Sequence, residues 1–195
     1  MLPLTPETVL AAYRRGIFPM ARSRTGPVDW YSPDPRGILP LDAFHVPASL
    51  AKVVRSSRFE VTADRDFAGV IDGCAGRDQT WISFGVRETY LELHRRGRAH
   101  SVEAWKGGEL AGGLYGVHIA GAFMGESMFH RATDASKVCL VSLVAHLRAR
   151  GFALLDIQQV TPITERFGGT YVSRGEYLRL LRDAMERRVE WGTWG

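Results

Sequence analysis

Residues 99–129 restrict the fold of this chain more than any other part of its sequence. They read AHSVEAWKGGELAGGLYGVHIAGAFMGESMF, with runs of apolar residues separated by KGGE and HIAG. Short glycine-containing segments between such runs predict antiparallel hairpins. We therefore expect three antiparallel strands that form a meander.

The segments that follow the meander predict a protein of mixed α and β structure. We expect a long amphipathic helix over 134–150, a strand over 153–160 and a last helix over 173–188. Ser173 is the expected N-cap of the last helix, with Glu176 completing a capping box.

The part of the chain before the meander is expected to be mainly helical. Helices are predicted over 4–16, 49–56, 66–75 and 85–97, and a strand over 59–63. Thr5 and Pro6 suit the start of the first helix, and Gly16 suits its end. Residues 17–37 are rich in proline, glycine and aromatic residues and are expected to form a loop.

The stretch LLDIQQV, residues 154–160, places a carboxylate inside an apolar strand. Side chains alternate along a strand, so Asp156 and Gln158 share one face. A buried carboxylate is costly unless it is paired or needed. Two interpretations stay open from these residues alone: a strand end that faces water, with Asp156 capping a loop, or a functional pair.

Length and composition favour one globular domain. The 195 residues are 45% hydrophobic and 24% charged, which is usual for a soluble protein with a sizeable core. The apolar runs are too short to cross a bilayer and no leader opens the chain, so we expect a cytoplasmic protein. Cys74 and Cys139 lack ligand spacing and are expected to be free core thiols, without a metal site.

The charge balance is basic, and arginine dominates it. The formal net charge is +4, and Lys52, Lys106 and Lys137 are the only lysines among 25 basic residues. The arginines cluster at 14–15, 22–24, 55–58, 95–98, 148–150 and 187–188. Guanidinium groups suit phosphate recognition, so the clusters indicate polyanion binding. A GC-rich genome that encodes arginine in place of lysine is the alternative explanation.

The order of these elements is that of the N-acetyltransferase (acyl-CoA N-acyltransferase) fold, in which the acyl donor lies where two central strands separate. Acetyl-coenzyme A would require a glycine-rich turn at the start of the helix after the meander, to bind its pyrophosphate. The segment there is MFHRATDASK, without glycine between Gly125 and Gly151. We therefore expect the acyl group to come from another carrier.

Eight short stretches together resemble one known family. They are, in order, AAYRRGIFPM, WYSPDPRGIL, VIDGCA, TWISFGV, LAGGLYGV, FMGESMF, ASK and LLDIQQV. The chain thereby resembles the leucyl/phenylalanyl-tRNA–protein transferases from about Leu4 to about Leu181. The resemblance implies transfer of leucine or phenylalanine from aminoacyl-tRNA to a protein with N-terminal Arg or Lys, a signal for N-end-rule degradation.

The same resemblance implies the domain organisation and the partners. Residues 1–35 would form an N-terminal helix with a Pro/Trp loop, and 36–195 an N-acetyltransferase-like catalytic domain with a central, mostly antiparallel sheet. Leu-tRNA and Phe-tRNA would be the donors, and no cofactor is required. A monomer without membrane association is expected.

Site residues follow by similarity, position by position. Asp156 and Gln158 would be the catalytic pair: Gln158 bonds the attacking amine, while Asp156 orients it and supplies negative charge. Trp81 would stack on the terminal adenosine, and Met20 stands where the family has a companion tryptophan. Glu126, with Ser127, would anchor the donor's ribose and amine or a basic acceptor.

An apolar pocket would hold the donor side chain. Its expected residues are Leu114, Phe123, Leu140, Leu143 and Leu147, with Met128 nearby. Leu143 and Leu147 are aromatic in other members, so the balance between leucine and phenylalanine is expected to differ here. An apolar stripe of this kind also suits an ordinary core.

Two other functions stay open at this level. A coenzyme A-dependent N-acetyltransferase would bind coenzyme A, which the missing phosphate turn disfavours. A non-catalytic tRNA-binding protein would use the arginines and leave the ester intact, but it does not explain the Asp156/Gln158 face. The sequence leaves undecided whether Asp156 is a base or an electrostatic stabiliser, and whether acidic N-termini are accepted.

Overall fold

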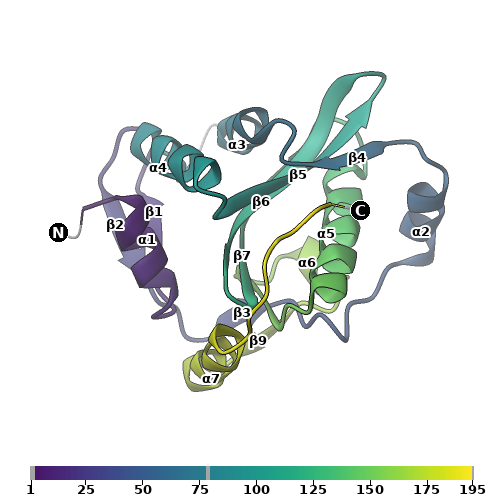
Figure 1. Cartoon of the computed structure of the whole chain (residues 1–195). Helices are drawn as coiled ribbons and strands as arrows, with labels where there is room; N and C mark the ends of the chain where they lie inside the picture. Colours follow the sequence, from purple (N-terminus) through teal and green to yellow (C-terminus); the bar gives the residue numbers. More distant parts are fainter. Residues whose placement is uncertain (1–2, 78–79, 195) are drawn as a thin grey trace.

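The computed structural model describes residues 3–77 and 80–194, and Figure 1 labels its helices and strands. The helices are α1 (Pro6–Tyr13), α2 (Ala48–Arg55), α3 (Phe67–Ala75), α4 (Phe84–Arg95), α5 (Ala135–Arg150), α6 (Pro162–Glu165) and α7 (Arg174–Met185). The strands are β1 (Phe18–Ala21), β2 (Val28–Tyr31), β3 (Arg36–Ile38), β4 (Glu60–Ala63), β5 (Ala99–Lys106), β6 (Glu109–Ile119), β7 (Ala122–His130), β8 (Leu154–Gln158) and β9 (Thr170–Val172).

A seven-stranded sheet in the order β4-β5-β6-β7-β8-β3-β9 organises the described residues. The predicted meander is β5, β6 and β7, and it pairs antiparallel throughout. The connection through α5 brings β8 parallel to β7, whereas β3 and β9 add antiparallel pairs beyond it. This mixed α+β architecture, with a mostly antiparallel sheet flanked by helices, confirms the predicted fold class.

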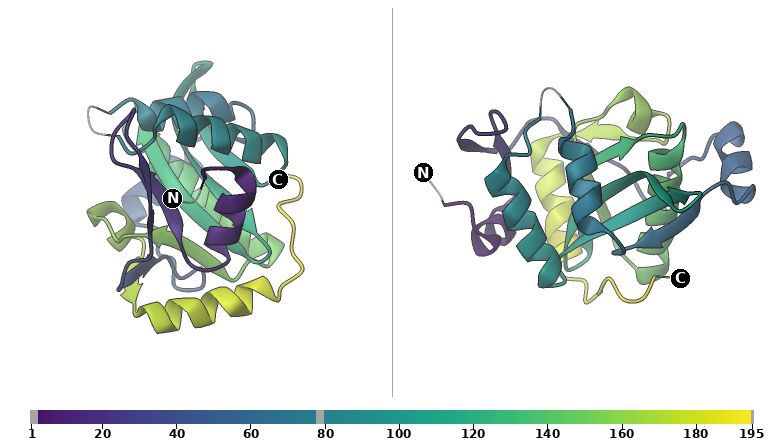
Figure 2. Two further views of the ribbon diagram at one scale, coloured as in Figure 1. Left: turned by 90° about the vertical axis from the view of Figure 1, so that its left-hand side faces the viewer. Right: turned by 90° about the horizontal axis from the view of Figure 1, so that it is seen from above.

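Helices cover both faces of the sheet. The face covered by α1, α3, α4 and α7, here called the α4 face, buries Val9, Tyr13, Tyr90 and Leu181 in one cluster. The opposite α5 face buries the leucines of α5 together with Leu50 of α2. Figure 2 shows α2 at one end of the molecule and the N-terminal hairpin at the other. No helix in the described part of the chain is both long and apolar enough to cross a bilayer.

The parallel strands β7 and β8 separate after three residue pairs. Their register runs from Ala122 opposite Leu154 to Met124 opposite Asp156. Immediately beyond, β7 contains a bulge, because Gly125 pairs with Gly116 and Ser127 with Tyr115. Glu126 is the extra residue between them. Bulges change the direction of side chains and are frequent beside active sites. This bulge lies where β7 and β8 separate.

Two predictions of local structure were wrong. Residues 17–37, expected to be a loop, contain the antiparallel hairpin β1–β2 and the start of β3. Each hairpin strand has only four residues, and Pro19 interrupts the first, so alternation is too short to indicate a strand. The sequence analysis also missed the short elements α6 and β9.

The start of α7 differs from prediction in its capping. Ser173 is the N-cap and its side chain accepts a hydrogen bond from the Glu176 N–H at 3.2 Å. The Glu176 carboxylate does not return to the cap, since it pairs with Arg179 at 2.7 Å. The reciprocal capping box is therefore absent. The predicted Thr5 cap and Pro6 at the start of α1 are confirmed.

The N-terminal segment shares its core with the rest of the chain. Val9, Tyr13 and Phe18 belong to the same buried cluster as Tyr115 of β6 and Leu181 of α7. The division at residue 35 therefore stays a prediction about folding units. Cys74 and Cys139 are buried free thiols, as expected.

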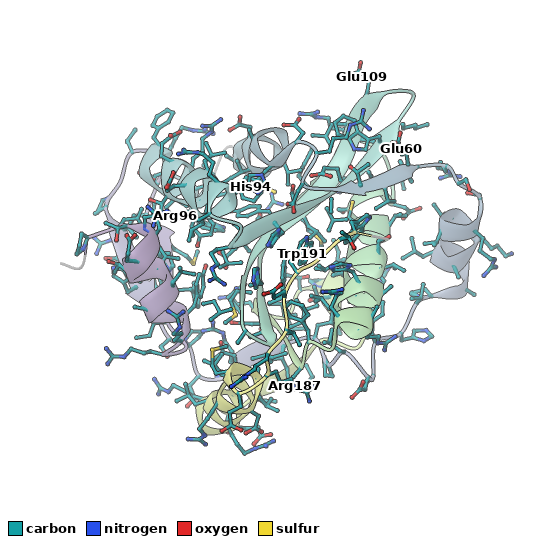
Figure 3. All side chains as sticks on the ribbon, viewed as in Figure 1. Glu60, His94, Arg96, Glu109, Arg187 and Trp191 are labelled. Atoms are coloured by element: carbon teal, nitrogen blue, oxygen red, sulfur yellow. The ribbon has the colours of Figure 1, made fainter. Side chains whose placement is uncertain are left out.

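The chain after α7 crosses back over the sheet towards α5, as the yellow trace in Figure 1 shows. Figure 3 labels Trp191 on this tail, near α5. Trp191 stacks on His100 with ring centroids 4.2 Å apart and lies 5.5 Å from Phe123. Its carbonyl oxygen is 2.9 Å from His146 Nε2. The tail thus covers a group of buried histidines on the α5 face.

Candidate active site

A cavity of about 660 Å³ occupies the opening between β7 and β8. Its walls come from both strands, from α5, and from the segments that carry Met20 and Trp81. Most of the residues predicted from the sequence line it: Met20, Trp81, Leu114, Glu126, Ser127, Met128, Leu140, Leu143 and Gln158. The cavity lies where the N-acetyltransferase-like order of elements predicts an acyl donor.

Asp156, Phe123 and Leu147 do not line the cavity, although the sequence assigned them to the site. All three are 0% exposed. Phe123 lies under the tail against Trp191, and Leu147 lies one helical turn beyond Leu143 on α5. Both belong to the layer behind the pocket wall. The family resemblance gave the correct faces of β7 and α5 but not the depth of each residue.

Asp156 is held by an ion pair with Arg36, which no local sequence pattern predicts. Arg36 Nε donates to Asp156 Oδ1 at 2.9 Å and Nη2 donates to Oδ2 at 2.6 Å. Tyr177 OH donates to Oδ2 at 2.8 Å, and the Gln158 N–H donates to Oδ1 at 2.9 Å. Each carboxylate oxygen therefore accepts two hydrogen bonds. The strand-end interpretation, with Asp156 facing water, is wrong.

The partner of Asp156 is equally enclosed. Arg36 is 1% exposed, and its guanidinium lies 4.6 Å from the ring centroids of both Phe18 and Tyr177. Burial acts to lower the pKa of Arg36, but the hydrogen bonds and charge of Asp156 more than offset it, so the pKa is raised. The signal in the sequence was an arginine between proline and the apolar run GIL.

Gln158 lies at the end of β8 in an unusual backbone conformation. Its φ is 56°, in the left-handed region that non-glycine residues seldom adopt. The neighbouring strand approaches so closely that a Cβ on Gly37 would lie 2.8 Å from the Gln159 carbonyl carbon. Glycine is therefore required at position 37. Such strain is typical of functional sites, and here it sets the direction of the Gln158 side chain.

Glu126 lies at the meeting point of the two strands and two helices of the α4 face. Tyr13 OH of α1 donates to Oε1 at 2.6 Å, and Tyr90 OH of α4 donates to Oε2 at 3.2 Å. The two tyrosine oxygens are 2.5 Å apart. From β8, Gln158 Nε2 donates to Oε1 at 3.4 Å. The predicted pair of Asp156 and Gln158 thus extends to a third residue, the acidic Glu126, across the opening.

The pKa of Glu126 is raised to about 7. Burial is the main cause, and the charge of Asp156 adds to it, whereas hydrogen bonds from Tyr13 and Tyr90 act in the opposite direction. Burial also raises the pKa of both tyrosines well above the ordinary value, so they stay neutral donors. A carboxyl with this pKa exchanges protons near neutral pH.

The wall of the cavity on the α5 face is apolar. Leu114, Leu140 and Leu143 line it, as predicted, and each is at most 5% exposed. Leu155 and Ile157 of β8 complete this wall and were not predicted. Their alternation with Asp156 and Gln158 along β8 was the available signal. One strand therefore supplies an apolar wall with one set of side chains and polar groups with the other.

Met20 and Trp81 lie together at the edge of the cavity. The Ala21 N–H donates to the Trp81 carbonyl oxygen at 3.1 Å, which joins β1 to the segment before α4. Both side chains line the cavity and are partly exposed. An indole and a thioether side by side form an apolar surface on which a flat ring can lie.

The start of α5 lacks the features of a pyrophosphate site. Residues 131–134 contain no glycine, and Asp134 is the N-cap with a left-handed φ of 72°. Its carboxylate pairs with Lys137 Nζ at 2.7 Å. A carboxylate at this position repels phosphate, which agrees with the expectation that the donor is not coenzyme A. Within residues 3–77 and 80–194, no group of His, Cys, Asp or Glu is arranged to hold a metal ion.

Some arginines of the predicted polyanion clusters already have acidic partners. Arg95 pairs with Glu92, and Arg96 pairs with both Glu92 and Glu7 of α1. Figure 3 shows Arg96 beside α1. Phosphate contacts by these two side chains would therefore have to replace existing ion pairs.

Comparison with known families gives consistent matches over nearly the whole chain. Residues 38–182 match the model described as "Leucyl/phenylalanyl-tRNA protein transferase", and residues 3–34 match that of its N-terminal domain. Similar curated proteins named leucyl/phenylalanyl-tRNA–protein transferase occur in Salinibacter ruber and Rubrobacter xylanophilus. The first is 54% identical over 96% of this chain and 83% of the relative. The second is 55% identical over 93% of this chain and 95% of the relative.

Solved structures with a related arrangement are more distant. The C-terminal domain of a putative lysylphosphatidylglycerol synthetase from Agrobacterium fabrum has a TM-score of 0.46 and 11% identity, covering 92% of this chain and 69% of that one. A GCN5-related N-acetyltransferase-like protein from Streptococcus suis has a TM-score of 0.40 and 16% identity, covering 86% and 64%. Similarities at this level do not bear on function.

Proposed function

The chain belongs to the leucyl/phenylalanyl-tRNA–protein transferase family, and on this premise we propose how its site carries out the transfer. It is an aminoacyltransferase that moves leucine or phenylalanine from aminoacyl-tRNA to the N-terminus of a protein. The acceptors are proteins that begin with Arg or Lys, and the product is marked for N-end-rule degradation. Aminoacyl-tRNA is a cytoplasmic substrate, so the reaction takes place in the cytoplasm.

The donor extends from one end of the cavity to the other. Its leucine or phenylalanine side chain occupies the wall formed by Leu114, Leu140 and Leu143, and its terminal adenosine stacks at Trp81 and Met20. The observation that supports this placement is that one cavity brings an apolar wall together with Glu126 and Gln158. The aminoacyl ester would then lie beside the polar groups of the α4 face.

The acceptor amine is oriented by Gln158, whose side chain borders the cavity. Because the Gln158 side-chain amide donates towards Glu126, its carbonyl oxygen is available to accept from the amine. Asp156 acts through Gln158. It accepts a hydrogen bond from the backbone N–H of Gln158, and Arg36 neutralises its charge. We assign Asp156 as a positioning and electrostatic residue. Placing amine and ester in line supplies a large part of the acceleration.

The transfer assay uses labelled Leu-tRNA and Phe-tRNA with peptides that begin with Arg, Lys, Asp or Glu. Wild type should label the Arg and Lys peptides from both donors. Gln158→Ala should lower the single-turnover rate by roughly 10²–10³-fold, because a preorganised hydrogen bond to the reacting group is lost. Affinity for tRNA, measured by filter binding, should stay unchanged.

The same assay separates the alternatives. Binding of tRNA without any labelled peptide would contradict the transferase assignment. Transfer at the wild-type rate by Gln158→Ala would instead place the amine elsewhere in the cavity. Preferential labelling of Asp and Glu peptides would leave the chemistry intact and correct the acceptor class.

A further inference from the structure

The polar wall of the cavity contains one carboxyl group that is free to change its protonation state. We propose that Glu126 accepts the proton of the acceptor's α-ammonium group, with Tyr13 and Tyr90 holding its carboxylate in place. The inference rests on the proposed aminoacyl transfer and assigns a catalytic residue to it. The proton acceptor is then Glu126 at the bulge in β7, and not Asp156 of β8.

Access to the cavity distinguishes the two acids of the site, because Glu126 is partly buried and Asp156 fully buried. Among the residues that the structure describes, Glu126 is the one carboxylate on the cavity wall. Asp156 is 0% exposed and is neutralised by a bidentate ion pair with Arg36. Protonation of Asp156 would leave the Arg36 charge buried without a counter-charge, which is very unfavourable. Glu126 has no such cationic partner, and its proton uptake removes a buried charge.

The surroundings of Glu126 suit reversible protonation. The groups that face it are Tyr13 of α1, Tyr90 of α4, Tyr115 of β6, Asp156 and Gln158 of β8 and, farther away, Arg36 of β3. The tyrosines are neutral and fully buried. Two neutral donors stabilise the ionised carboxylate enough to keep it available as a base, while burial keeps its pKa at about 7. An acid with this pKa is matched to its operating pH.

Glu126 takes up one proton during the transfer and returns it to water afterwards. The α-ammonium group of the acceptor transfers one proton to the Glu126 carboxylate, which becomes a neutral acid. The free nitrogen attacks the ester carbon, and a C–N bond forms. Its second proton passes to the ribose oxygen as the C–O bond to tRNA breaks. Glu126 then releases its proton to water through the open cavity, so the net products are a peptide, a free tRNA and one proton.

The test is the pH dependence of single-turnover transfer between pH 6 and 8.5. In wild type the rate should rise through an apparent pKa near 7. Glu126→Gln keeps the shape of the side chain but cannot take a proton, and should be roughly 10²–10⁴-fold slower at pH 7. Its deficit should shrink as pH rises, because more of the acceptor amine is already neutral. Gln158→Ala should instead stay slow at high pH, because it loses the group that orients the amine while Glu126 remains.

A tyrosine pair provides the matched control. Tyr13→Phe removes a hydrogen bond to the ionised carboxylate, so the pKa of Glu126 and the acidic limb should move to higher pH. Tyr115→Phe removes a buried hydroxyl that has no hydrogen-bond partner among residues 3–77 and 80–194, so the limb should stay in place. Infrared titration of the carboxyl C=O stretch in the unliganded protein gives the same comparison without activity.

The outcomes are distinguishable from failure of the proposed function. Wild-type transfer with a pH profile that Glu126→Gln leaves unchanged would overturn the assignment of Glu126 alone. Equal shifts in Tyr13→Phe and Tyr115→Phe would also overturn it. Absence of transfer by wild type would overturn the transferase proposal and this inference together.

Discussion

The two faces of the sheet bury ionisable groups in different states. On the α4 face the pairs are charged or proton-exchanging: Arg36 with Asp156, and Glu126 with its tyrosines. On the α5 face the buried ionisable side chains include His118, whose pKa is lowered to about 4, mainly by burial. The cavity lies between the faces and takes its polar wall from one and its apolar wall from the other.

This difference assigns chemistry and donor selection to separate sets of side chains on the same strands. Asp156 and Gln158 point from β8 to the α4 face, whereas Leu155 and Ile157 point to the α5 face. A mutation on one face should therefore change the rate or the donor preference, but not both. Substitutions on either face test this separation.

Asp156→Ala should lower the free energy of unfolding by about 3–5 kcal/mol, because it leaves Arg36 buried without a counter-charge. Arg179→Ala breaks an exposed ion pair with Glu176 and should have little measurable effect. Urea unfolding measures both. Equal, small effects would mean that the α4 face does not depend on its buried charge.

Acid should destabilise the protein through the α5 face. The folded-state pKa of His118 is about 4 and the unfolded value is 6.5, so only the unfolded chain takes up the proton between these values. The contribution of His118 to the free energy of unfolding is fully present above pH 6.5. It is lost as pH falls towards 4, and the loss amounts to about 3 kcal/mol.

The control for this effect is His118→Asn. The amide of the new side chain can donate a hydrogen bond to His100 or accept one from it. The groups that face His118 are His100, Arg98 and Asp64. Unfolding midpoints measured from pH 7.5 to 4.5 should fall less steeply in the variant. Parallel slopes would show that His118 takes up its proton in the folded state.

Leu143→Phe should shift donor preference towards leucine. The side chain lines the cavity and is 1% exposed, so a larger ring fills space that the donor needs. The ratio of Leu-tRNA to Phe-tRNA transfer rates should change. The change should correspond to a difference in activation free energy of about 1–3 kcal/mol. Leu143→Met conserves volume and should leave the ratio near that of wild type. A ratio that does not move in Leu143→Phe would place the donor side chain elsewhere.

The sequence was sufficient for features that depend on local pattern. Glycine-separated apolar runs gave the β5–β7 meander, and alternation along β8 gave the shared face of Asp156 and Gln158. Resemblance to a family then gave site residues most of which line the cavity. These features depend on neighbours along the chain or on motifs of a few residues.

Features that depend on distant contacts were not predictable in this way. Tyr13 and Tyr90 occur in amphipathic helices, and no local pattern indicates that both hydroxyls reach Glu126. Arg36 is one arginine among many, and its burial is decided by Asp156, 120 residues later. The bulge at Glu126 appears only when the partners of β6 are known. The sequence therefore indicated which residues matter, but not which acid is enclosed and which is open.

The contacts of the two acids set the order in which the site can form during protein synthesis. Glu126 bonds Tyr13 and Asp156 bonds Arg36, 113 and 120 residues apart, and Tyr177 must also be in place. At typical translation rates, Tyr13 leaves the ribosome roughly 8–30 s before Tyr177. During that time the N-terminal aromatic residues lack their partners. Arg36 cannot be buried in its ion pair until Asp156 has been synthesised. A nascent or truncated chain should therefore have no partial activity, and the enzyme becomes competent in one late folding step.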